Sequence, residues 1–372
     1  MLSWLFVIVL SLLLVFLFKQ KVIRQNTYVM MQSLIFGWFV SFGGKAMTDQ
    51  YSYLQFYNSI ANTPLGLFKL FTDHIKSITS PRHTLELGYV FLNVLFSKIG
   101  FGYVGFIFIF SVAINYLLLK FIVGSKTIYF TIIIFITSSL FAQQANLVRQ
   151  LMAVAIFAYS IKYLISRQLI KYLLIILLGS TIHMSALILI PFYFIVDRHF
   201  PKYFIILFWM ISVLINLFGI ELGWLKSFNF IYYDTTIQRI NRPEELLFSY
   251  TINLLFIISV LLSQKKMFNE PFIRLSFNLY FIWVVLLNLT ALGFLFYRIS
   301  LYFSVFSIII IPLIPQFYRE NDFIKKIRLD KYSSFLLIPM FIFYVNILIR
   351  RIISSDVITL GTEFYSFTDF LR

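Results

Sequence analysis

The chain has 372 residues, of which 60% are hydrophobic and 12% are charged, and its mean hydropathy is +0.88. Soluble domains carry about a quarter charged residues, so this composition excludes a soluble globular protein, and the absence of cysteine excludes disulfides and thiolate metal sites. The net charge of +16 is carried by single or paired basic residues between apolar runs, which favours positive-inside membrane topology over nucleic-acid binding.

Apolar runs recur from end to end and predict an all-α, polytopic integral membrane protein with about 11–13 transmembrane helices. We expect these helices to form a single domain, residues 1–372. No basic residue precedes the first run and no small-residue cleavage site follows it, so we expect it to be retained rather than removed as a signal peptide. The candidate spans are residues 2–18, 28–44, 102–119, 127–141, 150–165, 171–182, 184–196, 203–220, 246–263, 273–291, 299–316 and 333–349.

The distribution of basic residues predicts how these spans are oriented. With both termini outside, the inner loops hold 18 Lys and Arg residues against 5 Asp and Glu residues, whereas the outer segments hold 13 and 10. Residues 85–98 would disturb this alternation if they crossed the membrane, so we expect them to form a half-inserted or surface helix. The inner loops are residues 19–27, 120–126, 162–171, 197–202, 264–274 and 317–332.

Two neighbouring runs, 171–182 and 184–196, are each too short to cross a hydrocarbon core of about 30 Å alone. They meet at the polar sequence GSTIHMS. Short or broken helices are tolerated where such a junction faces a water-filled cavity, so we expect an outward-facing cavity here. The outer segments are 45–101, 220–245 and the tail 350–372. The first two are rich in Tyr, Asn, Thr and acids, which suits carbohydrate but also an interfacial aromatic belt.

The stretch QQANLVRQ, residues 143–150, separates two apolar runs with amides and one arginine. A guanidinium at the outer start of a helix can bind a phosphate through two hydrogen bonds, and the helix dipole adds to the attraction. The alternative for Arg149 is an interfacial anchor that snorkels to water. An anchor needs no amides beside it, so we expect Arg149 to bind phosphate, with Gln144, Asn146 and Gln150 lining the site.

His183 lies in the junction GSTIHMS between the two short runs. Imidazole titrates near neutral pH, so this side chain could act as a general base or bind phosphate. The alternative is a buried histidine that bonds Ser180, Thr181 or Ser185. A zinc site needs three or four convergent ligands, and no such spacing occurs, so we expect neither a metal nor another cofactor.

Two acids of the outer segment 45–101 are further candidate bases. Asp49 stands before Tyr51 and Tyr53 in TDQYSY, and Glu86 stands in LELGY. Either carboxylate could deprotonate a sugar hydroxyl, and the two tyrosines could contact the sugar. The alternative for an isolated acid is a solvated loop carboxylate.

Two outer arginines complete the candidate site. Arg298, in FYRISLYF, would be a second phosphate ligand or an anchor in the aromatic belt. Arg239, in TIQRINR, would be a loop cation or part of a lid that contacts the substrate.

The order of these motifs matches a known family. Arg149-Gln150 opens a helix rich in small residues, the basic loop Arg167–Lys171 follows, and His183–Ala186 and Pro191 come next. This order resembles the central region of the EpsG family of Wzy-type bacterial exopolysaccharide polymerases, and the resemblance is densest over about 145–195. TDQYSY, LELGY and RISLYF resemble other elements of the family, although a lysine stands in GGKAMTD where the family usually has an arginine.

The resemblance implies a polymerase in the bacterial cytoplasmic membrane with a Wzy-like or GT-C-like helical fold and an outward-facing site. Its substrate would be an oligosaccharide on undecaprenyl diphosphate. A hydroxyl of one repeat unit would attack the anomeric carbon of another, while Arg149 and Arg298 stabilise the leaving diphosphate without a metal. His183, Asp49 or Glu86 would take the proton. Membrane lipid, a flippase and a chain-length regulator are the expected partners.

Three other functions share these features. A flippase for the same lipid-linked sugar would need a similar cavity, although transporters often show two related halves and no repeat is seen here. A glycosyltransferase that uses a lipid-monophosphate sugar, or an O-antigen ligase, would also place an outer acid beside basic residues. An acyltransferase with His183 as its base would need an acyl carrier on the inner side, whereas the expected topology puts His183 outside.

Overall fold

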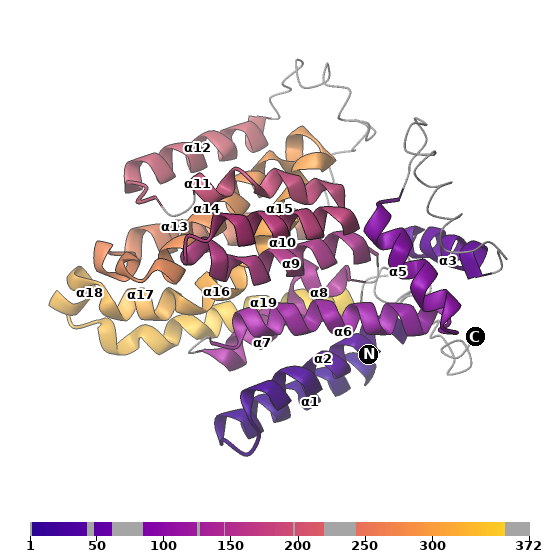
Figure 1. Cartoon of the computed structure of the whole chain (residues 1–372). Helices are drawn as coiled ribbons and strands as arrows, with labels where there is room; N and C mark the ends of the chain where they lie inside the picture. The colour runs from indigo at the N-terminus through magenta and orange to yellow at the C-terminus, as the bar shows by residue number, and fades with distance from the viewer. Residues whose placement is uncertain are drawn as a thin grey trace. The chain divides into compact units, whose positions relative to one another are not determined.

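Helices make up every regular element that the computed structural model describes, and no strand occurs in the described ranges (Figure 1). The predicted all-α membrane class is therefore confirmed. The helices form two compact groups, unit 1 (Met1–Ile190 and Ile342–Arg372) and unit 2 (Pro191–Phe341). The described residues are 2–42, 48–61, 85–124, 127–144, 146–195, 198–218 and 243–353.

Unit 1 is built mainly from apolar helices. They are α1 Leu2–Lys19, α2 Gln25–Phe42, α3 Thr48–Ala61, α5 Leu87–Lys98, α6 Tyr103–Ile122, α7 Ile128–Thr137, α8 Ser139–Ala142, α9 Val148–Ile165, α10 Leu169–Ile182 and the 3₁₀ helix η1 Met184–Leu189.

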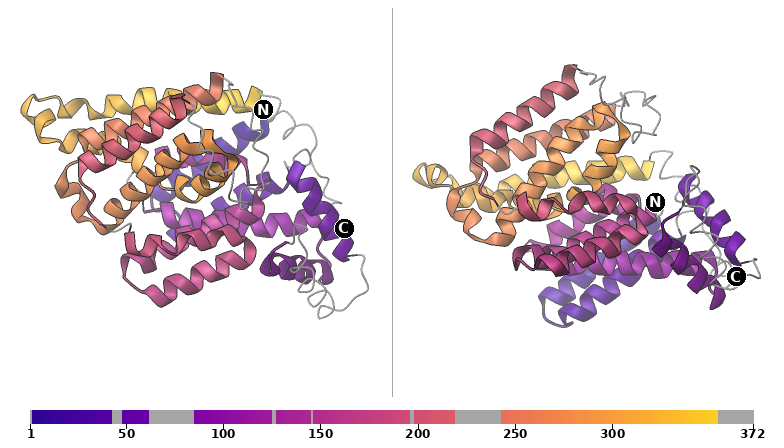
Figure 2. Two further views of the ribbon diagram at one scale, coloured as in Figure 1. Left: turned by 90° about the horizontal axis from the view of Figure 1, so that it is seen from above. Right: turned by 45° about the horizontal axis from the view of Figure 1, so that its top comes forward.

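The centre of unit 1 is the stack of α2 on α6, α6 on α9 and α9 on α10, with α1 beside α2 (Figures 1 and 2). Gly37 allows α2 to approach α6 closely, since a Cβ at this position would lie 2.4 Å from Cγ2 of Val112 and 3.1 Å from its backbone nitrogen. A glycine inside a helix costs about 1 kcal/mol relative to alanine. The close contact between α2 and α6 explains why a glycine stands at this position.

The hairpin of α9 and α10 turns at Ser166–Gln168. The amide of Gln168 donates to the carbonyl of Tyr163 at 2.8 Å and that of Arg167 to Leu164 at 3.3 Å, the two bonds of a Schellman cap. Arg167 has the left-handed φ of 56° that this cap requires. Basic residues at helix carboxyl ends also interact favourably with the helix dipole.

One predicted span of unit 1 is interrupted. Residues 127–141 form two helices, α7 and α8, because Ser138 between them is extended with ψ 158°. The hydroxyl of Ser138 donates to the carbonyl of Phe135 at 2.6 Å. Serine side chains compete in this way with the helical backbone pattern.

Unit 2 contains four helices of 11 to 20 residues, α12 to α15, together with shorter α- and 3₁₀-helices. They are α11 Phe192–Ile195, α12 Lys202–Phe218, α13 Pro243–Leu262, η3 Lys265–Asn269, α14 Pro271–Asn288, η4 Leu289–Leu292, α15 Phe294–Ser304, α16 Ser307–Ile310, η5 Ile311–Leu313, α17 Ile314–Glu320, α18 Asp322–Lys326 and η6 Asp330–Leu336, followed by α19 Leu337–Ile353, which continues into unit 1.

Within unit 2, α14 packs against α12, α13 and α15. Buried polar side chains join three of these helices. Trp209 donates to the amide oxygen of Asn253 at 2.7 Å, Asn253 and Asn288 exchange bonds of 2.8 and 3.0 Å, and Asn288 donates to Ser212 at 3.0 Å. In an apolar bundle such paired polar groups hold helices together.

Three described helices, α6, α9 and α14, are long and apolar enough to cross a membrane by length and composition. The segments Leu295–Ser304 and Ser307–Glu320 form a fourth candidate with a bend of 41°, which lies in the predicted span 299–316. Several shorter apolar helices accompany them, including α10, α12 and α5. The expected total of about 11–13 spans stays a prediction.

Candidate functional site

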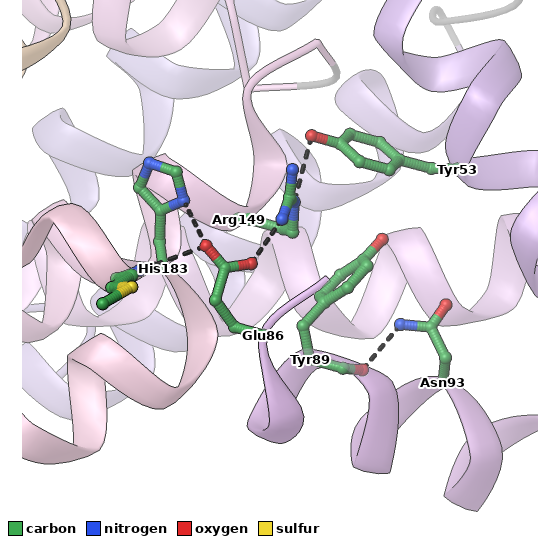
Figure 3. A network of polar contacts seen from close by, with 7 residues as sticks. Tyr53, Glu86, Tyr89, Asn93, Arg149 and His183 are labelled. Atoms are coloured by element: carbon green, nitrogen blue, oxygen red, sulfur yellow. Dashed lines mark hydrogen bonds and ion pairs between the residues drawn. The ribbon is translucent and has the colours of Figure 1, made fainter. Parts of the chain in front are cut away.

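Four side chains that the sequence singles out meet within unit 1, although they come from four separate elements (Figure 3). Tyr53 lies on α3, Glu86 directly precedes α5, Arg149 is in the first turn of α9 and His183 follows α10. Glu86 and His183 are 97 positions apart in the chain, and Glu86 and Arg149 are 63 apart.

Glu86 stands at the amino end of α5 but does not cap that helix with its side chain. A short polar side chain at the N-cap position, such as that of Asp or Ser, usually accepts a hydrogen bond from a free amide of the first turn. Here the carboxylate turns away from α5: Oε2 forms an ion pair with Nη1 of Arg149, and Oε1 lies 3.1 Å from Nδ1 of His183. Glu86 therefore links α9 to the end of α10.

A close helix contact brings Glu86 to this place. A Cβ on Gly88 would lie 2.4 Å from Oγ1 of Thr181 and 2.8 Å from its carbonyl oxygen, so only glycine lets the first turn of α5 rest on the last turn of α10. That contact sets Glu86 beside the residues that follow α10.

The end of α10 presents His183 and an amide. His183 is extended, with φ −152° and ψ 110°, so the α-helix stops and η1 begins at Met184. An amide at the start of a helix has no partner within the helix. The Met184 amide donates instead to Oε1 of Glu86 at 3.1 Å.

Two tyrosines surround the guanidinium of Arg149. Nε donates to the hydroxyl of Tyr53 at 3.1 Å, and the guanidinium carbon lies 5.1 Å from the centre of the Tyr53 ring and 5.6 Å from that of Tyr89. The two rings pack edge to face, 5.7 Å apart. Cation–π contacts and the ion pair with Glu86 together hold the arginine in one orientation.

The site is mostly withdrawn from water, since the side chains of Arg149, Glu86 and His183 are 18%, 16% and 13% exposed. Burial on its own would raise the pKa of the Glu86 carboxyl. The hydrogen bond from His183, the positive charge of Arg149 and a backbone amide outweigh burial and lower that pKa to about 2. Glu86 is therefore an anion across the physiological pH range.

The predicted amides are not all placed toward this cluster. Gln144 is fully buried and exchanges two hydrogen bonds, of 2.8 and 3.1 Å, with Asn115 on α6. This pairing joins the turn before α9 to α6, and it takes up the amide group of Gln144 within the fold. Gln150 is 2% exposed, and Asn146 is half-buried.

The remaining predicted residues lie elsewhere. Tyr51 is 62% exposed on α3, the helix that carries Tyr53. Asp49 is in the first turn of α3, and its side chain lies outside the described part of the structure, as does the whole of Arg239. Arg298 is half-buried on α15 of unit 2.

Two groups of the site were not predicted. Tyr89 lies in the first turn of α5, three residues after Glu86. Side chains at this spacing are neighbours on a helix, so the motif LELGY could have indicated Tyr89 as a site residue. The Met184 amide has no sequence signal, because any non-proline residue carries one. Neither group is a titrating base, and both restrict the orientation of a charged partner.

The arrangement combines a fixed cation, an imidazole and a carboxylate in a partly buried site. It can bind an anion at Arg149 and move a proton at His183. In the described ranges, no three His, Asp or Glu side chains are grouped so as to hold a metal ion.

The comparison with known protein families supports the resemblance seen in the motifs. No curated protein and no solved structure matches the chain. The model of the EpsG family, however, matches residues 26–358, which include Glu86, Arg149, His183 and both units' described helices from α3 to α18. The chain belongs to the EpsG family.

Proposed function

We propose that this protein is a polysaccharide polymerase that joins lipid-linked oligosaccharide repeat units on the outer face of the cytoplasmic membrane. The donor would be an oligosaccharide on undecaprenyl diphosphate, an activated substrate whose leaving group is the anion that an arginine recognises. The family and the apolar helices support a membrane protein of exopolysaccharide synthesis, and the assignment of the reaction rests on Arg149.

Arg149 is built as an anion-binding group. Glu86 takes Nη1 and Tyr53 takes Nε, while Nη2 has no hydrogen-bond partner among the described residues. A guanidinium has five N–H donors, so it can stay anchored through two nitrogens and still offer its third to a phosphate oxygen. The aromatic rings on α3 and α5 keep it from turning away.

In the proposed reaction, a hydroxyl of one repeat unit attacks the anomeric carbon of another, and the bond from that carbon to the lipid diphosphate breaks. Negative charge builds on the departing oxygen, and a fixed guanidinium in a partly buried site stabilises it more than mobile water does. A single displacement would invert the anomeric centre. His183, Glu86 and Asp49 are the candidate bases, and the exposed ring of Tyr51 is a candidate contact for the glycan.

The test replaces the arginine without removing its charge. Arg149→Lys loses the planar fork, and the loss of one transition-state donor lowers rates by about 100-fold or more. Purified protein in liposomes would receive lipid-linked repeat units extracted from cells that lack this gene, and the product ladder would be measured. Arg167→Lys, at the exposed turn on the opposite end of α9, is the matched control.

We expect wild type and Arg167→Lys to add whole repeat units and Arg149→Lys to add few. Transfer of the substrate across the bilayer without lengthening would identify a flippase and contradict the proposal. A normal ladder from Arg149→Lys at equal protein level would show that Arg149 does not bind the diphosphate.

A further inference from the structure

Glu86 uses both of its oxygens to hold other groups. Oε2 pairs with Arg149, and Oε1 accepts the Met184 amide and contacts Nδ1 of His183, each at 3.1 Å. The two oxygens offer about four acceptor sites, so these three contacts leave at most one site for a substrate proton. The geometry therefore suits Glu86 to orient its neighbours and not to act as the base itself.

The contact with Glu86 also decides which nitrogen of His183 carries the proton. A carboxylate only accepts hydrogen bonds, so Nδ1 must be the protonated nitrogen and Nε2 the one with a free lone pair in the neutral ring. Nε2 has no partner among the described residues, and the ring is 13% exposed. The imidazole is thus held in the tautomer that can accept a proton.

The same carboxylate controls two functional atoms at once. It fixes His183 through Nδ1 and Arg149 through Nη1, and it leaves Nε2 of the first and Nη2 of the second uncommitted among the described residues (Figure 3). Glu86 thus holds both a proton acceptor, His183, and a hydrogen-bond donor for an anion, Arg149. That juxtaposition is what a transfer from a diphosphate to a hydroxyl requires.

We infer that His183 is the general base, acting through Nε2, and that Glu86 is the positioning residue for both His183 and Arg149. This inference rests on the proposed polymerase function. Nε2 takes the proton of the acceptor hydroxyl, the hydroxyl oxygen bonds to the anomeric carbon, and the bonding pair leaves with the lipid diphosphate. The imidazolium then releases its proton to water, which restores the neutral tautomer.

Few charged groups of the packed helices lie near His183, so a change at its ring reports on its pairing with Glu86. Glu86 and Arg149 are the charged side chains at this end of α5 and α9, the helices packed on α10, and Tyr53 and Tyr89 are the titratable ones beside Arg149. The other cations of the two packed helices, Lys98 and Lys162, lie near their opposite ends.

The tautomer of His183 tests the pairing without any substrate. Nitrogen-15 NMR of the purified full chain, labelled in histidine, shows which ring nitrogen of the neutral imidazole carries the proton, and the spectrum of His183→Asn assigns the His183 signals. The proton should sit on Nδ1 in wild type, and it should move largely to Nε2 in Glu86→Ala, which removes the acceptor at Nδ1. Glu270→Ala should leave the His183 signals unchanged, and His199 in unit 2 serves as the internal reference in every sample.

Turnover tests the catalytic role. His183→Asn keeps a side-chain N–H that can bond Glu86 but lacks the basic nitrogen, so kcat should fall about 100-fold or more with little change in KM. The measurement is the rate of glycan lengthening in liposomes, with lipid-linked repeat units from cells that lack this gene. Glu86→Gln keeps an acceptor oxygen for Nδ1 of His183 and Glu86→Ala does not, so Glu86→Gln should retain more kcat than Glu86→Ala at a similar KM.

The outcomes separate the two proposals. If wild type lengthens glycans and His183→Asn retains its kcat, the polymerase stands and the base assignment is wrong. A His183 tautomer that is the same in wild type and Glu86→Ala contradicts the positioning role, and His183→Asn still tests the base if Glu86→Ala does not fold. If wild type lengthens no glycan although the tautomer changes in Glu86→Ala, the proposed function is wrong and the catalytic role of His183 with it.

Discussion

Glu86 connects two side chains that carry or can carry positive charge, and the ion pair is lost when the Glu86 carboxylate takes up a proton at low pH. Removing one partner of such a pair leaves an uncompensated charge in a site that is mostly closed to water. Arg149 would lose the anchor at Nη1, and the ring of His183 would lose the contact that sets its tautomer. Glu86 is therefore the residue on which the rest of the site depends.

We predict that Glu86 stabilises the protein above pH 4.5 and loses this effect as the pH falls. Its pKa is lowered from 4.5 to about 2 in the folded chain, so the stabilisation, about 3 kcal/mol from this shift, is complete above the unfolded value and disappears between about 4.5 and 2. The measurement is the thermal unfolding midpoint in detergent for wild type and Glu86→Gln.

The gap between the two midpoints should be widest above pH 4.5 and should narrow toward pH 2. Glu270→Gln is the control, because Glu270 is exposed and makes no side-chain cap to α14. A gap for Glu86→Gln that stays constant over the whole range would show that the carboxylate is not paired in the folded protein.

Gln144, one of the amides near Arg149 in the sequence, has its partner in a different helix. Gln144 and Arg149 belong to the same polar stretch, and both were predicted to line the site. Gln144 instead pairs with Asn115, because the turn before α9 directs it toward α6. A local sequence shows that a polar side chain needs a partner, but the partner can be another part of the fold.

At the scale of elements, the contact of α5 with α10 places the site. Residues 85–98 were predicted to form a helix, and α5 confirms that helix, while its depth in the membrane stays a prediction. The sequence of α5 does not show that Gly88 packs against Thr181 of α10. The missing side chain lets α5 approach the backbone of Thr181, and Glu86 is carried along to His183.

We predict that Gly88→Ala separates α5 from α10 and disables the site. The new Cβ would fall 2.8 Å from the carbonyl oxygen of Thr181, which no side-chain rotation can relieve, and such overpacking costs about 1–3 kcal/mol. Polymer yield in cells at equal expression should fall, and the thermal midpoint of the purified protein should drop.

Gly124→Ala is the matched control, since a Cβ there meets nothing within 4 Å. It should leave yield and thermal midpoint unchanged. Wild-type polymer from Gly88→Ala would mean that the close approach of the two helices has no part in function.

At the scale of the whole molecule, the basic residues predict which side of the membrane the site faces. In the described ranges, three non-glycine residues have left-handed φ: Lys21, Arg167 and Arg328. All three are basic, follow the end of a helix and fall in loops predicted to face inward. Glu86, just before α5, and Arg149, in the first turn of α9, fall at segments predicted to face outward. Because the chain has no cysteine, single introduced cysteines can test each side directly.

We predict that Tyr51→Cys reacts with a membrane-impermeant maleimide in intact cells and that Lys326→Cys reacts only after the membrane is permeabilised. Both positions are exposed, so differences in labelling report on sidedness and not on burial. The cysteine-free wild type is the blank. Labelling of Lys326→Cys in intact cells, with none of Tyr51→Cys, would reverse the topology and place the site on the inner face.

The sequence by itself determined the all-α membrane class and the motif residues that identify the family, because hydrophobic transfer and short motifs are properties of local segments. Only the tertiary structure decided that Glu86 joins Arg149 and His183, that Tyr89 supports the arginine, and that Gln144 is turned inward. These contacts join residues 29 to 97 positions apart. Their geometry depends on how helices approach one another, and a glycine that permits one close approach cannot be told from any other glycine in the sequence alone.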